Sequence, residues 1–189
     1  MEFRLPDEQH ALILRARSGD LHAFQLLVEK HQQFVYTVAF RLLGSREEAR
    51  DAAQEVFVRL WKGLGSYDPN RRFTTWLYKI AANLCCDLLR RSKRRPQLIT
   101  NDADDRLLWQ GDLEASISDI ELAERIRLLS HDLAPRQRLV FVLRDLHELE
   151  LEEISEITGL NVSTVKSNRY YARRNLRARC QKLGYLDEM

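Results

Sequence analysis

The chain has 189 residues and nearly balanced charge, with 30 Lys or Arg against 28 Asp or Glu and a formal net charge of +2. Its seven Gly and four Pro are few, which favours long helices over a turn-rich sheet fold. Three cysteines, of which Cys85 and Cys86 are adjacent, exclude a disulfide framework and a four-cysteine zinc site, so we expect reduced thiols. The N-terminus has no apolar signal segment and no apolar run approaches ~20 residues, so we expect a cytoplasmic protein.

The near-neutral total hides a strong segregation of charge along the chain. The segment from Asp102 to Glu124 is rich in acidic residues and contains only one basic residue, Arg106. From Ile157 to Leu186 there is no acid at all, while Lys and Arg accumulate. Asymmetry of this kind indicates a polyanion as the partner of the basic C-terminal end.

The first part of the chain predicts a helical bundle over residues 1–95. Apolar residues recur at helical spacing, and Ser18-Gly19-Asp20 has the pattern of a helix stop followed by a new N-cap. Ser45 should cap a further helix, and residues 63–72 (GLGSYDPNRR) should form a loop because of their Gly, Pro and Asn content. The predicted helices cover residues 7–43 with the break at 18–20, 46–62 and 73–91.

The second part predicts a linker followed by a smaller helical domain. Pro96 should close the first domain, and the acidic segment 96–118 has no clear period, which is typical of a partly disordered linker. Residues 119–189 should form the second domain, with Pro135 near the start of its second helix. No strand alternation appears, so we expect an all-α fold of two small helical domains. The predicted helices cover residues 119–131, a range starting near 135, 151–158 and 162–182.

The last two predicted helices have the pattern of a helix-turn-helix. Ile154, Ile157 and Val165 fall where such a pair needs buried contacts, and Gly159 permits the tight turn. The N-terminal residues of the second helix of such a pair contact base edges in the major groove, and arginines farther along contact phosphates. A solvated basic helix in an ordinary bundle is the alternative. The DNA-facing candidates are Ser163, Thr164, Lys166, Ser167, Arg169, Tyr170, Arg173 and Arg174.

Two more faces carry residues suited to binding. On the predicted helix 73–91, one aromatic ring and several hydrogen-bonding groups suit strand-separated DNA, because stacking contributes about 1–3 kcal/mol per base. On the predicted helix 46–62, an acid–amide strip edged by aromatic residues suits a protein partner, since aromatics anchor interfaces. Alone, each pattern also fits an ordinary half-buried helix face. The first face consists of Trp76, Lys79, Asn83, Asp87 and Arg90, and the second of Asp51, Gln54, Glu55, Phe57 and Trp61.

Together these motifs resemble the extracytoplasmic-function (ECF) branch of the sigma-70 family, over nearly the whole chain. Residues 17–20 (RSGD) are similar to the opening helix break of the family, and 51–61 (DAAQEVFVRLW) resemble the polymerase-binding helix of region 2. Residues 73–83 (FTTWLYKIAAN) resemble the helix that recognises the promoter −10 element. Residues 135–138 (PRQR) resemble the start of region 4, and 164–167 (TVKS) resemble its recognition helix.

The resemblance implies a sigma factor, which directs bacterial core RNA polymerase to promoters and assists their opening. The acid–amide strip and its aromatics would dock on the clamp helices of the β′ subunit, and the second domain would pack on the β flap and recognise the −35 element. The family also implies an anti-sigma factor as partner, and no enzymatic activity, cofactor or metal. The −10 element would be contacted by Tyr67, Asn70, Arg71, Arg72, Trp76, Lys79, Asn83, Asp87 and Arg90.

One segment departs from the family pattern. Where many members have Arg-Leu-His-Arg after the Thr-Val-Lys-Ser motif, this chain has Asn168-Arg169-Tyr170-Tyr171. The usual −35 preference therefore does not carry over. A one-component helix-turn-helix regulator is the rival interpretation, which accounts for residues 152–182 but leaves 51–95 unexplained. An enzyme acting on nucleic acid would need a phosphate loop or a metal cluster, and the sequence has no such motif.

Overall fold

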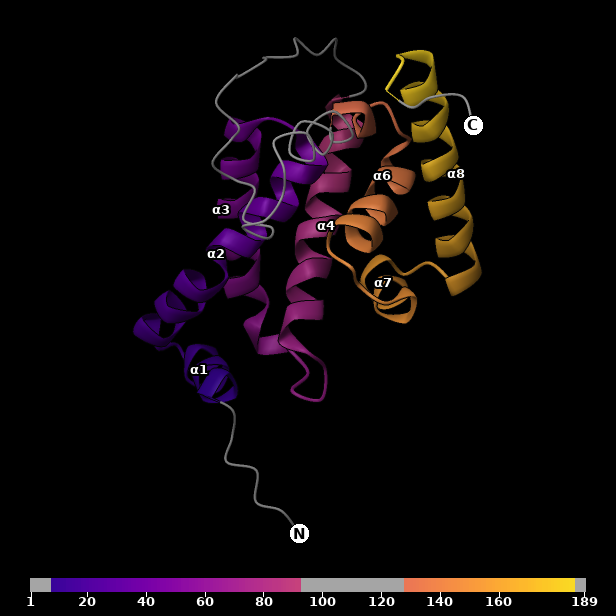
Figure 1. Ribbon diagram of the computed structural model, residues 1–189. Coiled ribbons are helices and arrows are strands. Elements are labelled where there is room, and N and C mark those ends of the chain that lie inside the picture. Colours follow the sequence, from indigo (N-terminus) through magenta and orange to yellow (C-terminus); the bar gives the residue numbers. More distant parts are fainter. Residues whose placement is uncertain (1–7, 93–127, 186–189) are drawn as a thin grey trace, which may run out of the picture.

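The computed structural model describes residues 8–92 and 128–185, and within these ranges it consists of helices and connecting turns without a strand (Figure 1). No helix among the described residues is long and apolar enough to cross a membrane. The all-α prediction is confirmed, whereas the linker predicted at 96–118 lies outside the described residues. The elements are α1 Glu8–Arg17, α2 Leu21–Leu43, α3 Arg46–Gly63, η1 Leu64–Ser66, α4 Phe73–Ser92, α6 Pro135–Phe141, η3 Val142–Leu146, α7 Leu151–Thr158 and α8 Val162–Lys182.

The first helices begin and end at the predicted capping residues. Asp20 caps α2, because its Oδ1 accepts a hydrogen bond from the backbone N–H of Ala23 at 3.0 Å. Ser45 caps α3 in the same way, with its Oγ 3.3 Å from the backbone nitrogen of Glu48. These side chains satisfy donors that a helix leaves unpaired at its N-terminus. Gly44 ends α2 with φ 84°, a conformation that glycine adopts without strain.

The N-terminal half is a bundle in which α2, α3 and α4 pack against one another and α1 packs on α2. Leu27 and Val35 of α2, Val56 and Leu60 of α3 and Leu77 of α4 are fully buried. They recur at helical spacing, so each helix turns one apolar stripe towards the shared core. Burial of each of these side chains stabilises the fold by about 1.5–3 kcal/mol.

The C-terminal half consists of α6, η3, α7 and α8, with α8 packed along α6 and α7 in contact with α8. The segment η3 is π-helical and continues α6 directly. A π-turn holds one residue more than an α-turn, and Val142 and Leu143 are both fully buried within it. Of the helix predicted over residues 119–131, only 128–131 are described; 128–130 are helical and His131 lies in the turn that follows.

The two halves pack closely against each other, with α4 between α2 and α3 on one side and the C-terminal helices on the other (Figure 1). Leu139, Val140 and Ile154 from the second half belong to the same buried apolar cluster as the N-terminal core. A partly buried hydrogen bond crosses the boundary, where Arg41 Nη1 donates to the carbonyl oxygen of Leu146 at 2.7 Å. The two predicted domains therefore share one core in this conformation.

Candidate nucleic-acid and protein-binding surfaces

The helices α7 and α8 form the predicted helix-turn-helix. Ile154 and Ile157 of α7 and Val165 of α8 are fully buried, which confirms their predicted core positions. Gly159 ends α7 with φ 70°, so it supplies the left-handed residue that the short connection requires. The motif thus has the buried contacts and the tight turn on which a helix-turn-helix depends.

Side-chain hydrogen bonds fix the turn between the two helices. The Ser155 hydroxyl donates to the carbonyl oxygen of Leu160 at 2.6 Å. Asn161 caps α8, because its Oδ1 accepts from the backbone N–H of Thr164 at 2.8 Å. Its φ and ψ are extended, as the residue before a helix requires. The first turn of α8, where base contacts are expected, is therefore fixed in place by the Asn161 cap.

The outer surface of α8 is basic and exposed. Tyr170 is 62% exposed and lies edge-on to Tyr171, with ring centroids 5.4 Å apart. Positive and polar side chains without a competing acid on the same helix suit phosphate contacts and base edges. Thr164 and Arg169 are half-buried. The other predicted −35 residues are all exposed: Ser163, Lys166, Ser167, Tyr170, Arg173 and Arg174.

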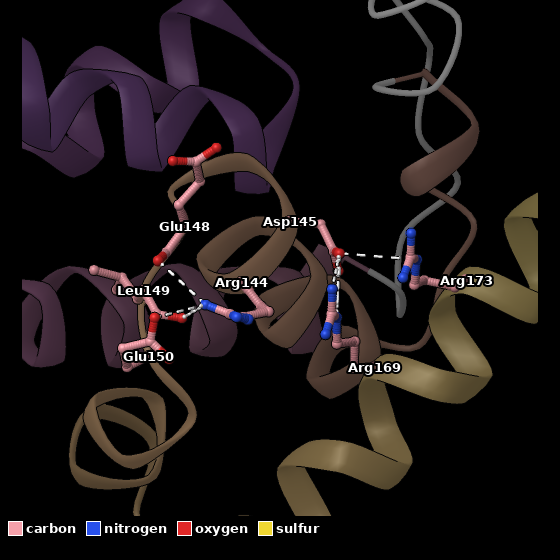
Figure 2. A network of polar contacts seen from close by, with 7 residues as sticks. All are labelled: Arg144, Asp145, Glu148, Leu149, Glu150, Arg169 and Arg173. Atoms are coloured by element: carbon pink, nitrogen blue, oxygen red, sulfur yellow. Dashed lines mark hydrogen bonds and ion pairs between the residues drawn. The ribbon is translucent and has the colours of Figure 1, made fainter.

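Arg169 differs from its neighbours because its guanidinium is bound by Asp145 of η3 (Figure 2). Its Nη2 donates to Asp145 Oδ1 at 2.8 Å, and its Nε lies 3.1 and 3.3 Å from the two carboxylate oxygens. This hydrogen bonding, together with the negative charge of Asp145, raises the pKa of Arg169. Arg173 reaches the same carboxylate from one turn farther along, with its Nε 3.8 Å from Oδ1.

The adjacent Arg144 holds the loop that leads into α7 (Figure 2). Its Nη1 donates to the carbonyl oxygens of Leu149 at 2.8 Å and Glu148 at 3.3 Å, and it lies 3.4 Å from the carboxylate of Glu150. Glu148 has φ 56°, the one positive φ among the described residues other than glycine. The successive residues Arg144 and Asp145 therefore fix the two helices of the motif, one each.

Sequence reasoning did not identify Arg144 and Asp145. A usable signal for Asp145 lies in α8, whose buried residues Val165, Ala172 and Leu176 leave a gap in the apolar stripe at Arg169. A charged side chain at a buried stripe position needs a partner of opposite charge. The sequence alone does not say which acid supplies it.

The predicted −10 face of α4 is present as an exposed row of polar side chains. Lys79, Asn83, Asp87 and Arg90 are all exposed. Arg90 Nη1 donates to Asp87 Oδ1 at 2.8 Å, so part of this row is paired along the helix. Trp76 is half-buried and packs on Tyr67, with ring centroids 5.1 Å apart. Part of the Trp76 side chain is therefore packed within the fold.

The loop before α4 has a buried residue and an exposed part. Tyr67, which we expected on the DNA-binding surface, is only 6% exposed, and its hydroxyl donates to the carbonyl oxygen of Arg71 at 2.6 Å. Tyr67 therefore stabilises the loop by a contact on its buried side, and burial raises the pKa of Tyr67. Asn70, Arg71 and Arg72 are exposed. Arg71 Nη1 also pairs with Glu156 of α7 at 3.1 Å, so the loop touches the second half.

The strip on α3 is likewise divided between surface and core. Asp51, Gln54 and Glu55 are exposed, as expected of a protein-binding surface. Phe57 is only 9% exposed and belongs to the core. Trp61 is half-buried against Phe24 of α2, with ring centroids 4.8 Å apart. The two aromatic residues that we expected to flank a docking surface therefore pack within the bundle.

No metal or nucleophile site emerges from the residues that the structure describes. Within them there is no group of three or more His, Cys, Asp or Glu side chains that could hold a metal ion. Cys85, Cys86 and Cys180 are free thiols, and all three are buried. Burial raises the pKa of Cys85 to about 12, so its thiol stays protonated at neutral pH and is a poor nucleophile.

Comparison with known proteins places both halves in one family. The family model for sigma-70 region 2 matches residues 27–95, and that for sigma-70 region 4 matches residues 123–176. The ECF RNA polymerase sigma factor SigW of Bacillus subtilis is 35% identical over 90% of this chain and 96% of its own length. The ECF RNA polymerase sigma-E factor of Escherichia coli K12 is 32% identical over 97% of this chain and 98% of its own length.

Solved structures agree with this assignment at the level of the fold. The structure of CnrH in complex with the cytosolic domain of CnrY has a TM-score of 0.67 and 26% identity, and the match covers 93% of this chain and 99% of that one. The sigma factor RpoE of Bartonella quintana, solved with the anti-sigma factor NepR, has a TM-score of 0.63 and 19% identity, covering 87% and 98%. The chain belongs to the ECF branch of the sigma-70 family.

Proposed function

We propose that this protein directs bacterial core RNA polymerase to specific promoters and assists the opening of their DNA. The observation that carries the proposal is the coexistence, in one chain of this family, of an exposed acid–amide strip on α3 and an exposed basic face on α8. The two surfaces lie on either side of α4 (Figure 1). A factor that joins an enzyme to DNA needs two such surfaces, whereas a simple DNA-binding regulator needs only the second.

The polymerase contact is assigned to Asp51, Gln54 and Glu55 of α3. These three side chains are exposed and lie along one side of the helix, so they can meet the clamp helices of the β′ subunit without any change in the bundle. Phe57 and Trp61 would support this surface from below, because both pack inside the N-terminal half. The C-terminal half would bind the β flap.

The DNA contacts are assigned to three places. The exposed part of the loop, Asn70–Arg72, and the polar row on α4 would contact the −10 element as its strands separate. Bases become readable on their edges once they are unpaired, and extracting one costs a few kcal/mol. The basic face of α8 would enter the major groove of the −35 element.

Simultaneous occupation of both promoter elements would require the two halves to separate. The −10 and −35 elements are about 25 base pairs apart, which corresponds to roughly 85 Å at 3.4 Å per base pair. A compact protein of this length has a radius of gyration of only ~16 Å. The contacts of Arg41 with Leu146 and of Arg71 with Glu156 would therefore break on the promoter.

The protein would act by binding and positioning, with the polymerase supplying the chemistry, and would work in the cytoplasm where the polymerase is. A separate inhibitor would restrain it. The related CnrH was solved with the cytosolic domain of CnrY, which supports the idea that members of this family are held by a protein partner.

Run-off transcription with bacterial core polymerase and a library of promoter fragments tests the proposal. We expect selective initiation that depends on this protein and is lost when Asp51, Gln54 and Glu55 are all changed to alanine. A triple alanine variant at Glu29, Gln32 and Gln33, which are exposed polar residues of α2, is the control and should initiate normally.

Two results would count against the proposal. Equal loss of initiation in both triple variants would contradict the assignment of the α3 strip to the polymerase contact. Absence of initiation, together with tight sequence-specific binding of duplex DNA by the protein alone, would favour a one-component regulator instead.

A further inference from the structure

The role of Arg169 in the basic face of α8 follows from its place on the helix. Val165, Ala172 and Leu176 are buried on one side of α8. Arg169 lies four residues after the first of them and three before the second, so helical spacing puts it on this same side. Its side chain is 31% exposed, whereas that of Arg173 is 63% exposed. Arg169 therefore faces η3, away from the surface that carries Tyr170.

The partner of Arg169 is well enclosed. The Asp145 side chain is only 13% exposed, and it receives donors from both the Nε and the Nη2 of Arg169. A two-point contact of this kind fixes direction as well as distance, because the guanidinium is planar. It joins α8 to η3 at a point one helical turn after Val165, close to the residues expected to meet DNA (Figure 2).

We propose that Asp145 is a positioning residue for DNA recognition, which holds the recognition helix through Arg169, and that Arg169 itself does not contact DNA. The inference rests on the proposed function of α8 as the −35 reader. It divides the arginines of this face into two groups. Arg169 orients the helix, while Arg173, which only borders Asp145, remains available to a phosphate.

The direction in which Asp145→Asn changes DNA affinity distinguishes a positioning role from a purely electrostatic one. Asp145 carries a negative charge near the DNA surface, so if its charge were all that mattered, Asp145→Asn would strengthen DNA binding. If it positions α8, the same change weakens binding, because Arg169 loses an ionised acceptor. We expect the weakening to be about tenfold, the usual size for one charge-assisted hydrogen bond.

A second variant tests Arg169 directly. A phosphate contact tolerates Lys in place of Arg because a point charge suffices, whereas the two-point contact with Asp145 needs the planar guanidinium. We therefore expect Arg169→Lys to weaken binding about as much as Asp145→Asn. Near-normal binding by Arg169→Lys would assign Arg169 to a phosphate and overturn the proposal.

The experiment measures the affinity of the reconstituted holoenzyme for a promoter fragment at several salt concentrations. Each lost phosphate contact lowers the slope of log affinity against log salt concentration by about 0.9. We expect this change for Lys166→Ala and Arg173→Ala, and an unchanged slope for Asp145→Asn and Arg169→Lys despite their lower affinity. Thermal unfolding of each variant shows that the comparison is made on folded protein.

Asp132→Asn is the matched control. Asp132 also pairs with an arginine of α8, Arg179, but near the far end of the helix. We expect no change in affinity or slope for this variant. Stronger binding by Asp145→Asn, with a normal loss of slope in Lys166→Ala, would overturn the positioning role alone. Unchanged slopes in Lys166→Ala and Arg173→Ala would overturn both this inference and the assignment of α8 to DNA.

Discussion

The hydroxyl of Tyr78 on α4 lies 3.3 Å from Nδ1 of His147, which follows η3, so these two residues meet across the contact between the two halves. The other ring nitrogen of His147 is buried and has no hydrogen-bond partner among the described residues. Burial, reinforced by the positive charge of Arg41, lowers the pKa of His147 to about 4. Burial also raises the pKa of Tyr78. Both groups are therefore neutral at physiological pH.

This contact predicts a loss of stability in mild acid. In the unfolded chain the pKa of His147 is about 6.5, whereas in the folded protein it is lowered to about 4. The free energy of unfolding should therefore fall as the pH drops from 6.5 towards 4. At pH 4.5 this one group should lower the free energy of unfolding by about 2.5 kcal/mol.

Denaturant unfolding at pH 7 and pH 4.5 measures the effect. The variant His147→Gln keeps a polar group next to Tyr78 but does not titrate, so it should lose less stability between the two pH values than the wild type. His22→Gln, at an exposed position, should behave as the wild type does. Identical losses in His147→Gln and the wild type would show that His147 protonates freely in the folded protein.

Gly44 is expected to be far less tolerant of alanine than Gly159. Both have positive φ, but a Cβ on Gly159 would meet nothing within 4 Å, whereas a Cβ on Gly44 would overlap the His131 ring. Gly159→Ala should therefore cost only the conformational strain, about 1 kcal/mol. Gly44→Ala should cost a further 1–3 kcal/mol or so, from overpacking. Thermal unfolding of the two variants gives the comparison, and equal costs would contradict it.

The opposite substitution should stabilise the protein at Glu148. Its φ of 56° is strained for any residue with a Cβ, and its side chain is exposed. Glu148→Gly should therefore raise the free energy of unfolding by about 0.5–1 kcal/mol, because the strain removed exceeds the extra freedom of the unfolded chain. Glu148→Ala keeps the strain and is the control. A variant with glycine that is no more stable than the one with alanine would contradict the prediction.

The N-cap of the recognition helix should contribute measurably to stability. Asn161→Ala removes the hydrogen bond to the backbone of Thr164, which should cost about 1 kcal/mol. Arg177→Ala, at an exposed position inside α8, should be nearly neutral because arginine and alanine are both good helix formers. The two free energies of unfolding decide the matter, and the prediction is wrong if the two variants are equally stable.

Helix boundaries were predictable because their signals are local. The range predicted for the last helix, 162–182, coincides with α8. The start of α8 depends on its N-cap, Asn161, and the end of α7 depends on Gly159. Each of these residues interacts with backbone groups within one helical turn. The short η1 and the π-helical η3 were not predicted, because neither has a comparable cap or spacing signal.

The second buried side of α4 was beyond sequence reasoning. Leu77, Ala81 and Leu84 are buried at helical spacing on one side of α4, but Thr75 and Tyr78 are buried as well. The hydrogen-bond partners of their side chains, Glu153 and His147, lie more than sixty residues farther along the chain. Periodicity reports that a face is apolar, and it does not report which distant element covers it.

The burial of two aromatic side chains was not foreseen for a related reason. Phe57 and Tyr67 were placed on binding surfaces, and both are buried in the structure. A helical pattern or a loop composition gives the approximate direction of an aromatic side chain, but rotation by a fraction of a turn decides between solvent and core. The polar members of the same sets, such as Glu55 and Asn70, are exposed as expected, because burial of an unpaired polar group is costly.

The position of α4 at the contact between the two halves has a consequence for synthesis of the chain on the ribosome. Helices α2, α3 and α4 are complete at residue 92, but the side of α4 with Thr75 and Tyr78 is completed by Glu153 and His147 of the second half. At roughly 5–20 residues per second, about 4–15 s pass before residue 165 is made. During that interval the first half presents a partly apolar face to solvent, on which the second half is then assembled.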